Sequence, residues 1–599
     1  MKQTQNQNQD QDKKQEKKKI SLLQKAIGFI TYKKTKNPPS FTLPESNEES
    51  GQGQDNAEQQ DGSAKSDKET DKQSSDSKSR RKATKKPLSP SALKSSKSES
   101  DEVKQDFDSN KKILEQQFHL PVNKDLIIRD FSIGNKQPGF IAYLDGMADK
   151  VIINDYILRP LFNETNNEMS KNQRLGPLED IILTNDTKSL KKVSTTVTEI
   201  LKGNTALYID GLDHFITCES IGYDKRGIEP PKTEGIVKGP QEGFSENLRT
   251  NISLIRRIVR NKDLITEFHE IGEKSNTTCA IVYLDGVVNP AVVKEVQRRL
   301  KNVKTDFLVS SGMLEQLIED NPYSIVPTIL STERPDRTAS HLIEGRAVII
   351  VDGSPFSMIV PVSMHALMHS PEDAALKWQY ATSLRFIRFV AVLAAAMLPA
   401  LYIALTTFHR EMIPTDLLIA IAKAKENVPF PTLVEILLME LGFELIREAG
   451  LRVPGIIGNT LGIIGALILG EAAVSANIVS PILIIIVAVT GLSSFAIPNY
   501  NLAFGVRITR FYFIGAGTLL GFYGISLALV AYVLMLVNLK SFGVPFISII
   551  SPRTKGSKDI IIKWPIWMQE SRPDYLNSPD RRRQPKITRQ WAEQDPNDA

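Results

Sequence analysis

The sequence predicts a multi-domain membrane protein with a disordered polar N-terminal tail, two related α/β subdomains and an α-helical transmembrane bundle of about four to six spans. Three observations predict this. The 599-residue chain is 41% hydrophobic and 24% charged on average, but residues 1–110 are almost wholly polar or charged. Strand-like and helix-like runs alternate from about 120 to 370, and charges become sparse from about 388 to 539. A chain of this length also exceeds a single core, so several domains are expected.

The N-terminal tail, 1–110, is of low complexity and cannot bury enough apolar surface to offset its ordering entropy, so we expect it to be disordered. Within it, 17–34 places apolar residues on one helical stripe between lysines. Three interpretations stay open: a basic amphipathic helix on an anionic membrane surface, a helix docked on protein, and a transient helix. The first residues lack the apolar core of a signal peptide, so the part before the first span is expected in the cytoplasm.

Four apolar runs that each end in Asp-Gly indicate an internal repeat. They cover 140–146, 206–211, 280–286 and 348–353. The first and third are each followed by a helical stretch, and the second and fourth come at nearly matching distances later. We therefore expect two related α/β subdomains, 120–232 and 233–370. Because Asp and Gly tolerate the backbone of tight turns, the pairs are interpreted as turn residues rather than ligand contacts.

The α/β part carries no recognisable catalytic or metal-binding pattern. It has no GxGxxG, P-loop, GxSxG or HExxH sequence, and its histidines are scattered. Cys218 and Cys279 form no CxxC pair and are expected to be small buried residues in a reducing compartment. The net charge of +5 is small, and no nucleic-acid-binding signature accompanies it. We expect no enzymatic activity, no cofactor, no metal site and no nucleic-acid partner.

Four arginines follow the Pro- and Gly-rich join between the two subdomains. They are Arg249, Arg256, Arg257 and Arg260, in and around a predicted helix. They are candidates for an interface with a partner subunit. A solvated basic helix face is the simpler alternative.

Residues 385–550 are predicted to form the transmembrane domain. The stretch 389–408 carries no charge over the roughly 20 residues that a bilayer core requires. Arg385 and Arg388 stand just before it, so the positive-inside rule places the α/β half in the cytoplasm. Further uncharged runs cover 453–470, 472–506 and 511–539. The tail 551–599 is basic, which indicates that both ends are cytoplasmic and that the number of spans is even.

Two segments complicate the count of spans. One apolar run also carries four carboxylates, so it is either an interfacial amphipathic helix or a re-entrant segment shielded by protein. Those carboxylates are Glu435, Glu440, Glu444 and Glu448. In the other segment, Pro498 and Asn499 are candidates for a break in a helix.

The helix expected from about 454 to 477 is the candidate pore lining. Its small residues let helices approach closely in lipid. Glu471, Val474 and Asn477 are expected on roughly one face, so that a ring of Glu471 attracts cations and a ring of Val474 closes the path by dewetting. The alternative is that Glu471 only ends the helix at the membrane surface.

Nine ordered stretches carry a family resemblance across about 120–565. Examples are 239–257, which includes Pro-Gln-Glu-Gly-Phe-Ser-Glu-Asn, and 494–500, which includes Phe-Ala-Ile-Pro-Asn-Tyr. At these residues the chain resembles the A subunits of GerA-type spore germinant receptors. The other stretches are 231–234, 319–324, 332–337, 344–356, 405–415, 440–450 and 540–545. The tail 1–110 departs from the pattern, because many members of the family lack it.

The resemblance implies a receptor complex. Its other members are a permease-like B subunit that binds the nutrient and a lipoprotein C subunit. It also implies the spore inner membrane, with the N-terminal domain on the cytoplasmic, spore-core side. In that picture several A subunits form an ion pore that opens when nutrient binds the neighbouring subunit. A secondary transporter, with a site at broken helices near the midplane, and a membrane-anchored signalling scaffold are the rival hypotheses.

Overall fold

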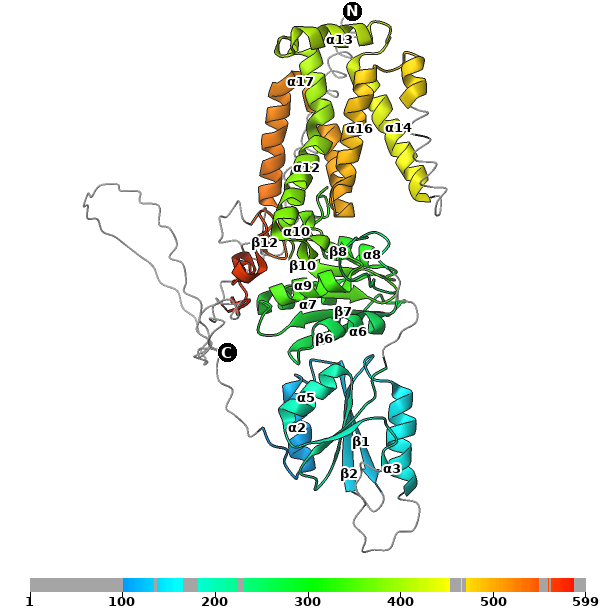
Figure 1. Ribbon diagram of the computed structural model, residues 1–599, viewed down its shortest axis with the longest axis vertical. Coiled ribbons are helices and arrows are strands. Elements are labelled where there is room, and N and C mark those ends of the chain that lie inside the picture. The colour runs from blue at the N-terminus through cyan, green and yellow to red at the C-terminus, as the bar shows by residue number, and fades with distance from the viewer. Residues whose placement is uncertain are drawn as a thin grey trace, which may run out of the picture.

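Two sheet-containing subdomains and a helical bundle follow one another along the long axis of the molecule (Figure 1). The computed structural model describes residues 101–133, 137–164, 181–222, 230–452, 465, 470–548, 559 and 562–585. Residues 1–100 of the tail 1–110, for which disorder was predicted, lie outside these residues, as does the predicted helix 17–34. In the described part, the expected order of α/β units followed by a helical domain is confirmed.

The first subdomain is built on a five-stranded sheet with the order β1-β2-β4-β5-β3, in which every neighbouring pair is antiparallel. Its strands are β1 Leu126–Ile133, β2 Gln137–Leu144, β3 Thr187–Leu190, β4 Thr205–Ile209 and β5 Phe215–Cys218. Helices α2 (Phe107–Gln117) and α5 (Val193–Lys202) pack over one apolar core of this sheet, and η2 (Ile152–Leu158) and α3 (Arg159–Glu164) lie over the other.

The second subdomain repeats this plan, with the strand order β6-β7-β9-β10-β8. Its strands are β6 Leu264–Ile271, β7 Thr277–Leu284, β8 Leu330–Thr332, β9 Ala347–Val351 and β10 Ser357–Val360. Its helices are α6 Leu248–Ile258, α7 Pro290–Asn302, α8 Ser311–Ile318, α9 Pro335–Glu344, α10 Met364–Met368 and α11 Glu372–Ala375. Corresponding strands occupy corresponding places in the two sheets, as the repeated Asp-Gly runs led us to expect.

The four Asp-Gly pairs end the equivalent central strands β2, β4, β7 and β9. Each glycine has a positive φ: 79° at Gly146, 86° at Gly211, 73° at Gly286 and 80° at Gly353. Side chains rarely adopt this backbone conformation, so glycine is favoured at these turns. The interpretation of the pairs as turn residues therefore agrees with the backbone.

The first subdomain begins earlier than the expected residue 120. Helix α2 starts after Asp106, whose carboxylate accepts a hydrogen bond from the Ser109 amide. Leu114 and Phe118 on and just after this helix are fully buried in the core of the first subdomain. The boundaries 1–110 and 120 are therefore corrected to about 100. Polar composition hid the helix, because only a few of its residues face the core.

Among the described residues of the helical bundle, two helices are long and apolar enough to cross a membrane, α12 (Trp378–Thr407) and α17 (Tyr500–Asn538). Between them lie η3 (Arg410–Met412), α13 (Thr415–Lys425), α14 (Thr432–Arg452) and the shorter apolar α16 (Pro481–Phe495). Small side chains of α12 face α17: the Ala400 carbonyl is 3.0 Å from where a Cβ on Gly517 would stand. Such close approach is the usual mode of helix packing in lipid.

Helix α17 folds back on itself at Gly521. The glycine has φ 60° and ψ −139°, a conformation essentially restricted to glycine. Two antiparallel arms result, and Phe513 of the first packs edge-on against Tyr532 of the second, with ring centroids 6.1 Å apart. Gly521 itself lies against Phe408 and His409, at the far end of α12.

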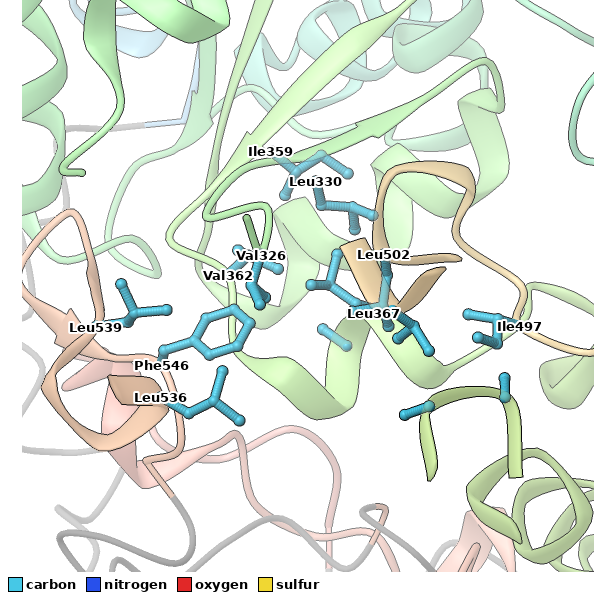
Figure 2. Close-up of a cluster of buried hydrophobic side chains, with 14 of the residues drawn as sticks. Val326, Leu330, Ile359, Val362, Leu367, Ile497, Leu502, Leu536, Leu539 and Phe546 are labelled. Carbon is cyan, nitrogen blue, oxygen red and sulfur yellow. The ribbon is translucent and has the colours of Figure 1, made fainter. Parts of the chain in front are cut away.

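An apolar cluster joins the bundle to the second subdomain. It combines side chains from the sheet unit, from the turn between α16 and α17, and from the end of α17. Figure 2 shows Val326, Leu330, Ile359, Val362, Leu367, Ile497, Leu502, Leu536, Leu539 and Phe546 in this cluster. Beyond α17, the short strands β11 (Lys540–Ser541) and β12 (Val544–Pro545) continue the contact, and Phe542 is buried in the other core of the second subdomain. The chain therefore returns to the second subdomain both at 497–502 and at 536–546.

The C-terminal residues 562–585 pack onto the second subdomain and include the short helices η4 (Ile566–Met568) and η5 (Asp574–Leu576). The Tyr575 hydroxyl is 2.9 Å from His365 Nε2, and Arg346 donates a hydrogen bond to it at 3.2 Å. Arg572 donates to the carbonyl of Ile343 at 2.7 Å. Within the expected basic tail 551–599, buried aromatic and apolar side chains anchor this part to the second subdomain.

Candidate functional site: charged side chains inside the helical bundle

Glu440 of α14 and Arg510 of α17 form a direct ion pair inside the bundle, and both side chains are almost completely buried. Arg510 Nε also donates a hydrogen bond to the Ala395 carbonyl of α12 at 2.8 Å. The pair therefore connects three helices. Among the described residues, Glu440 Oε1 and Arg510 Nη2 have no hydrogen-bond partner. Burying two charges with incomplete hydrogen bonding is costly, so this pair adds little stability beyond what apolar residues would supply.

A second group of charges lies one turn further along α14. Glu444 is 3.1 Å from Arg447 on its own helix and 3.5 Å from Arg507 on α17. Arg447 also donates a hydrogen bond to the Ser494 hydroxyl of α16 at 3.0 Å. Its guanidinium lies 5.0 Å from the ring centres of both Phe443 and Phe495, within the range of cation–π attraction.

A third carboxylate, Glu435, is fully buried at the start of α14. It is 3.0 Å from Lys425, the last residue of α13, and it accepts a hydrogen bond from the Ser480 amide at 3.0 Å. Ser480 immediately precedes α16, so one side chain holds α13, α14 and α16 together. The start of α14 and the start of α16 are consequently at the same end of the bundle.

The pore-lining candidates are only partly described, because 453–464 and 466–469 lie outside the described residues. Helix continues through 470–475, where the Glu471 side chain is exposed and Val474 is half-buried. Asn477 is not on this helix. It occupies a turn with φ 52°, so the expected common face of Glu471, Val474 and Asn477 is corrected to Glu471 and Val474. The turn leads to α16, whose N-cap is Ser480 and whose first residue is Pro481.

The break expected at Pro498 and Asn499 is present between α16 and α17. The Asn499 side chain caps α17 by accepting a hydrogen bond from the Leu502 amide at 2.9 Å. Both residues line a cavity of about 390 Å³ whose other wall belongs to the second subdomain, including Glu315 and Ser354. The break therefore lies at the end of the bundle that faces the second subdomain.

The four candidate interface arginines are engaged within the chain. Arg256 is 2% exposed and its Nε donates to Asp125 of the first subdomain at 3.0 Å. Arg249 is 3.1 Å from Asp145, and Arg257 is 2.6 Å from Glu242. Arg260 is exposed and donates to the Arg257 carbonyl. Arg256 was expected to face a partner subunit, and this expectation is corrected. Its guanidinium is buried and binds Asp125, so it joins the two subdomains of one chain.

Comparison with known proteins decides the family. Residues 112–575 match the family described as Bacillus/Clostridium GerA spore germination protein. The chain belongs to this family. The resemblance on which the sequence analysis relied is thus confirmed over most of the chain.

Several GerA-family relatives are similar over nearly their whole length. Spore germination protein KA of Bacillus subtilis (strain 168) is 40% identical over 483 residues, which are 80% of this chain and 88% of that protein. Spore germination protein GerLA of Bacillus cereus is 40% identical over 77% of this chain and 94% of that protein. The crystal structure of the N-terminal domain of the A subunit of the Bacillus megaterium spore germinant receptor GerK3 is 31% identical, with a TM-score of 0.34. It matches 43% of this chain and 95% of that one.

In this GerA-family chain, sequence reasoning missed the pairing of α14 with α17. It noted Glu440 and Glu444 on one helical face and Arg507 and Arg510 as interruptions of a span, but did not connect them. A signal was available: acids four residues apart on one helix and arginines three residues apart on another each define one face. Two such faces of opposite charge, both in apolar surroundings, favour direct contact because neither can face lipid.

Proposed function

We propose that the chain is the A subunit of a nutrient germinant receptor and that several copies form a cation channel. The observation that carries the channel is the set of charged side chains buried between α14, α16 and α17, centred on Glu440 and Arg510. Ionisable groups in membrane segments are costly and generally mark functional positions. A helix bundle that served only as an anchor would need none of them. We propose no enzymatic role.

The proposed topology has six passes: α12, α14, the segment that ends at 475, α16 and the two arms of α17. An even number is supported by the contacts at both ends. Helix α12 leaves the second subdomain, and the chain returns to the same subdomain at 536–546. The pairing of Glu435 with the Ser480 amide supports a further pass between α14 and α16, because it places the starts of both helices at one end.

We place the two α/β subdomains in the cytoplasm, on the core side of the spore inner membrane. The basic residues Arg553, Lys555 and Lys558 follow the last pass and favour this side. The receptor would be completed by a permease-like B subunit, which binds the nutrient, and by a lipoprotein C subunit. Members of the family named as germination proteins support this assignment, and the partners themselves belong to the proposal.

In the proposed pore, Glu471 and Val474 of several copies surround the axis. The exposure of Glu471 on a single chain supports this, because an exposed carboxylate beside apolar helices favours contact with water or with another copy. Glu471 then attracts cations and Val474 closes the path by dewetting. Asn477, in the turn that follows, would lie at the mouth of the pore.

The rival hypothesis of a secondary transporter expects its broken helix near the bilayer midplane. The break at Pro498 and Asn499 instead adjoins the second subdomain, which supports a channel. The arrangement also offers a route by which a change in the second subdomain could reach the helical bundle. The cavity at this break lies between the second subdomain and the first arm of α17.

The test uses spores that contain the chain with its partner subunits, and it measures release of monovalent cations with and without nutrient. Val474→Ala should cause release without nutrient, because a smaller side chain weakens the hydrophobic gate. Glu471→Gln should slow nutrient-triggered release while the complex still assembles. Val489→Ala, an exposed position on α16, is the matched control and should behave like the parent.

Normal dormancy and normal cation release in both Val474→Ala and Glu471→Gln would remove this helix from the pore. The purified complex should also contain several copies of the chain. A single copy in the assembled receptor would contradict the channel and favour the transporter.

A further inference from the structure

The C-terminal stretch 562–568 exposes a dense group of apolar side chains. Within seven residues, five apolar side chains are between 40% and 58% exposed: Ile562, Trp564, Ile566, Trp567 and Met568. Exposed apolar side chains concentrated in one short stretch are unfavourable in water and indicate an interaction surface, which we call the patch. The two tryptophans combine an apolar ring with an N–H group, a combination that suits a boundary between polar and apolar surroundings.

The position of this stretch is fixed by contacts with the base of α12. The Lys563 amide donates a hydrogen bond to Thr382 Oγ1 at 3.2 Å. The Lys563 ammonium is buried and donates to the carbonyls of Asp373 and Ala374, just before α12. Residues 562–568, at the start of the red segment in Figure 1, are therefore held beside the second turn of α12.

The length of α12 places that turn in the headgroup layer. The helix has 30 residues, so it is about 45 Å long, which equals the thickness of a bilayer including its polar headgroups. If α12 crosses the bilayer with the uncharged stretch 389–408 in the hydrocarbon core, Arg385 and Arg388 lie in the polar headgroup layer. Thr382 is seven residues, or about 10 Å, outside the core, at the outer side of that layer.

The charged side chains near the start of α12 are paired with one another, so they do not prevent this part of the surface from contacting lipid. Arg385 contacts Asp373 at 3.2 Å and Asp559 at 2.6 Å, and Arg388 contacts Asp373 at 2.7 Å. Both arginines are thus turned inward and paired. Among the exposed apolar side chains of α12 near this level, Phe386 is four residues after Thr382 and therefore lies on the helix face that 562–568 contacts.

We propose that 562–568 is an interfacial membrane anchor, with Trp564 and Trp567 in the headgroup layer of the lipid bilayer. Aromatic side chains concentrate at this depth in membrane proteins, where an amphipathic ring is most stable. The occupant of the patch is lipid, since the stretch is held against Thr382 and the exposed Phe386 lies one turn further along the same face of α12. The anchor would hold the second subdomain against the membrane. It requires α12 to cross the bilayer and does not depend on the channel.

The test uses the full chain reconstituted in vesicles of phosphatidylcholine and phosphatidylglycerol, with a single tryptophan in each variant. Trp378, Trp564, Trp567 and Trp591 are changed to Phe, and Trp564 or Trp567 alone is then retained. Bromine on the upper part of the lipid acyl chains should quench either retained tryptophan more strongly than bromine near the chain ends. Iodide in the water should quench them weakly.

A matched control carries Val237→Trp in the background without the four native tryptophans, because Val237 is 91% exposed on the soluble part. It should be quenched by iodide and not by brominated lipid. If Trp564 and Trp567 behave like this control, the patch is in water and the proposal is wrong. If neither quencher reaches them, protein covers the patch, through a second copy or another segment, and the proposal is equally overturned.

Discussion

The carboxylate of Glu440 and the guanidinium of Arg510 contact each other in the bundle, although they are 70 positions apart in the sequence. Each side chain neutralises the charge of the other. Without this pairing, neither α14 nor α17 could place its charged side chain against lipid. This reciprocity gives the two helices a fixed register, because a shift of one turn would leave Glu440 without its partner. Whether the pair also stabilises the bundle is a separate question, and single and double substitutions answer it.

Replacing one partner of this pair should destabilise the protein more than replacing both. Glu440→Met or Arg510→Met alone leaves a buried charge unpaired, and a loss of about 3–5 kcal/mol is expected. The double variant should recover most of that loss, since apolar residues fill the same space. Thermal unfolding of the purified protein in one detergent measures the effect. Arg452→Met, in an exposed pair with Glu448, is the control and should change stability by about 0–1 kcal/mol.

Loss of the Arg256–Asp125 contact should loosen the two subdomains from each other. Arg256→Met leaves the Asp125 carboxylate buried without its cation, which is expected to cost about 3–5 kcal/mol. Limited proteolysis should then cut the connection between the subdomains faster than in the parent. The exposed Arg260→Met serves as control, and equal cleavage of the two variants would contradict a joining role for Arg256.

Substitution of Gly521 should disrupt the fold of α17. Any side chain there adopts an unfavourable backbone conformation, at about 1–3 kcal/mol, and its Cβ would also meet Phe408 and His409 at about 3 Å. Gly521→Ala should therefore lower the thermal unfolding temperature in detergent. Gly515→Ala, whose Cβ meets nothing within 4 Å, should be tolerated. Similar unfolding temperatures for the two variants would show that the fold-back does not need glycine.

Contact between the C-terminal segment and the second subdomain should weaken in acid. Burial, followed by the charge of Arg346, lowers the pKa of His341 to about 4, and burial followed by His369 lowers the pKa of His365 well below its usual value. Both rings are neutral when folded and take up protons more readily when unfolded. Their contribution to stability is therefore complete above about pH 6.5 and is lost as the pH falls below that value.

Limited proteolysis of 562–585 in vesicle-embedded protein measures this effect. Cleavage should be faster at about pH 5 than at about pH 7.5. His365→Gln removes the titrating group that contacts Tyr575, so the difference between the two pH values should shrink in that variant. A rate that is independent of pH in the parent would contradict the role of these histidines.

The sequence predicted the order of domains because each class of segment has its own pattern. The Asp-Gly strand ends exposed the repeat, since the turn that follows each equivalent strand has the same backbone requirement. Helix α2 was missed because its few core-facing residues are surrounded by polar ones. Its role depends on Leu114 meeting a sheet whose strands come later in the chain, which no local pattern reports.

For the candidate site, the sequence identified unusual residues but not the residues that they contact. Glu440 and Arg510 were both noticed as unusual, but a contact across 70 positions depends on how helices pack rather than on spacing along either one. Arg256 illustrates the converse. A basic stretch on a helix predicts a solvated face, and only the fold shows that Asp125 of the first subdomain lies within 3.0 Å.

The contacts of Lys563 and Tyr575 with residues far earlier in the chain constrain the order of biogenesis. During synthesis the α/β subdomains and the first helices leave the ribosome long before residues 562–585 exist. His365 and the residues at the base of α12 therefore remain without these partners while the later helices are being made. Closure by the C-terminal segment can occur only after residues 562–585 have been made, so it would distinguish a chain that includes them from one that stops before them.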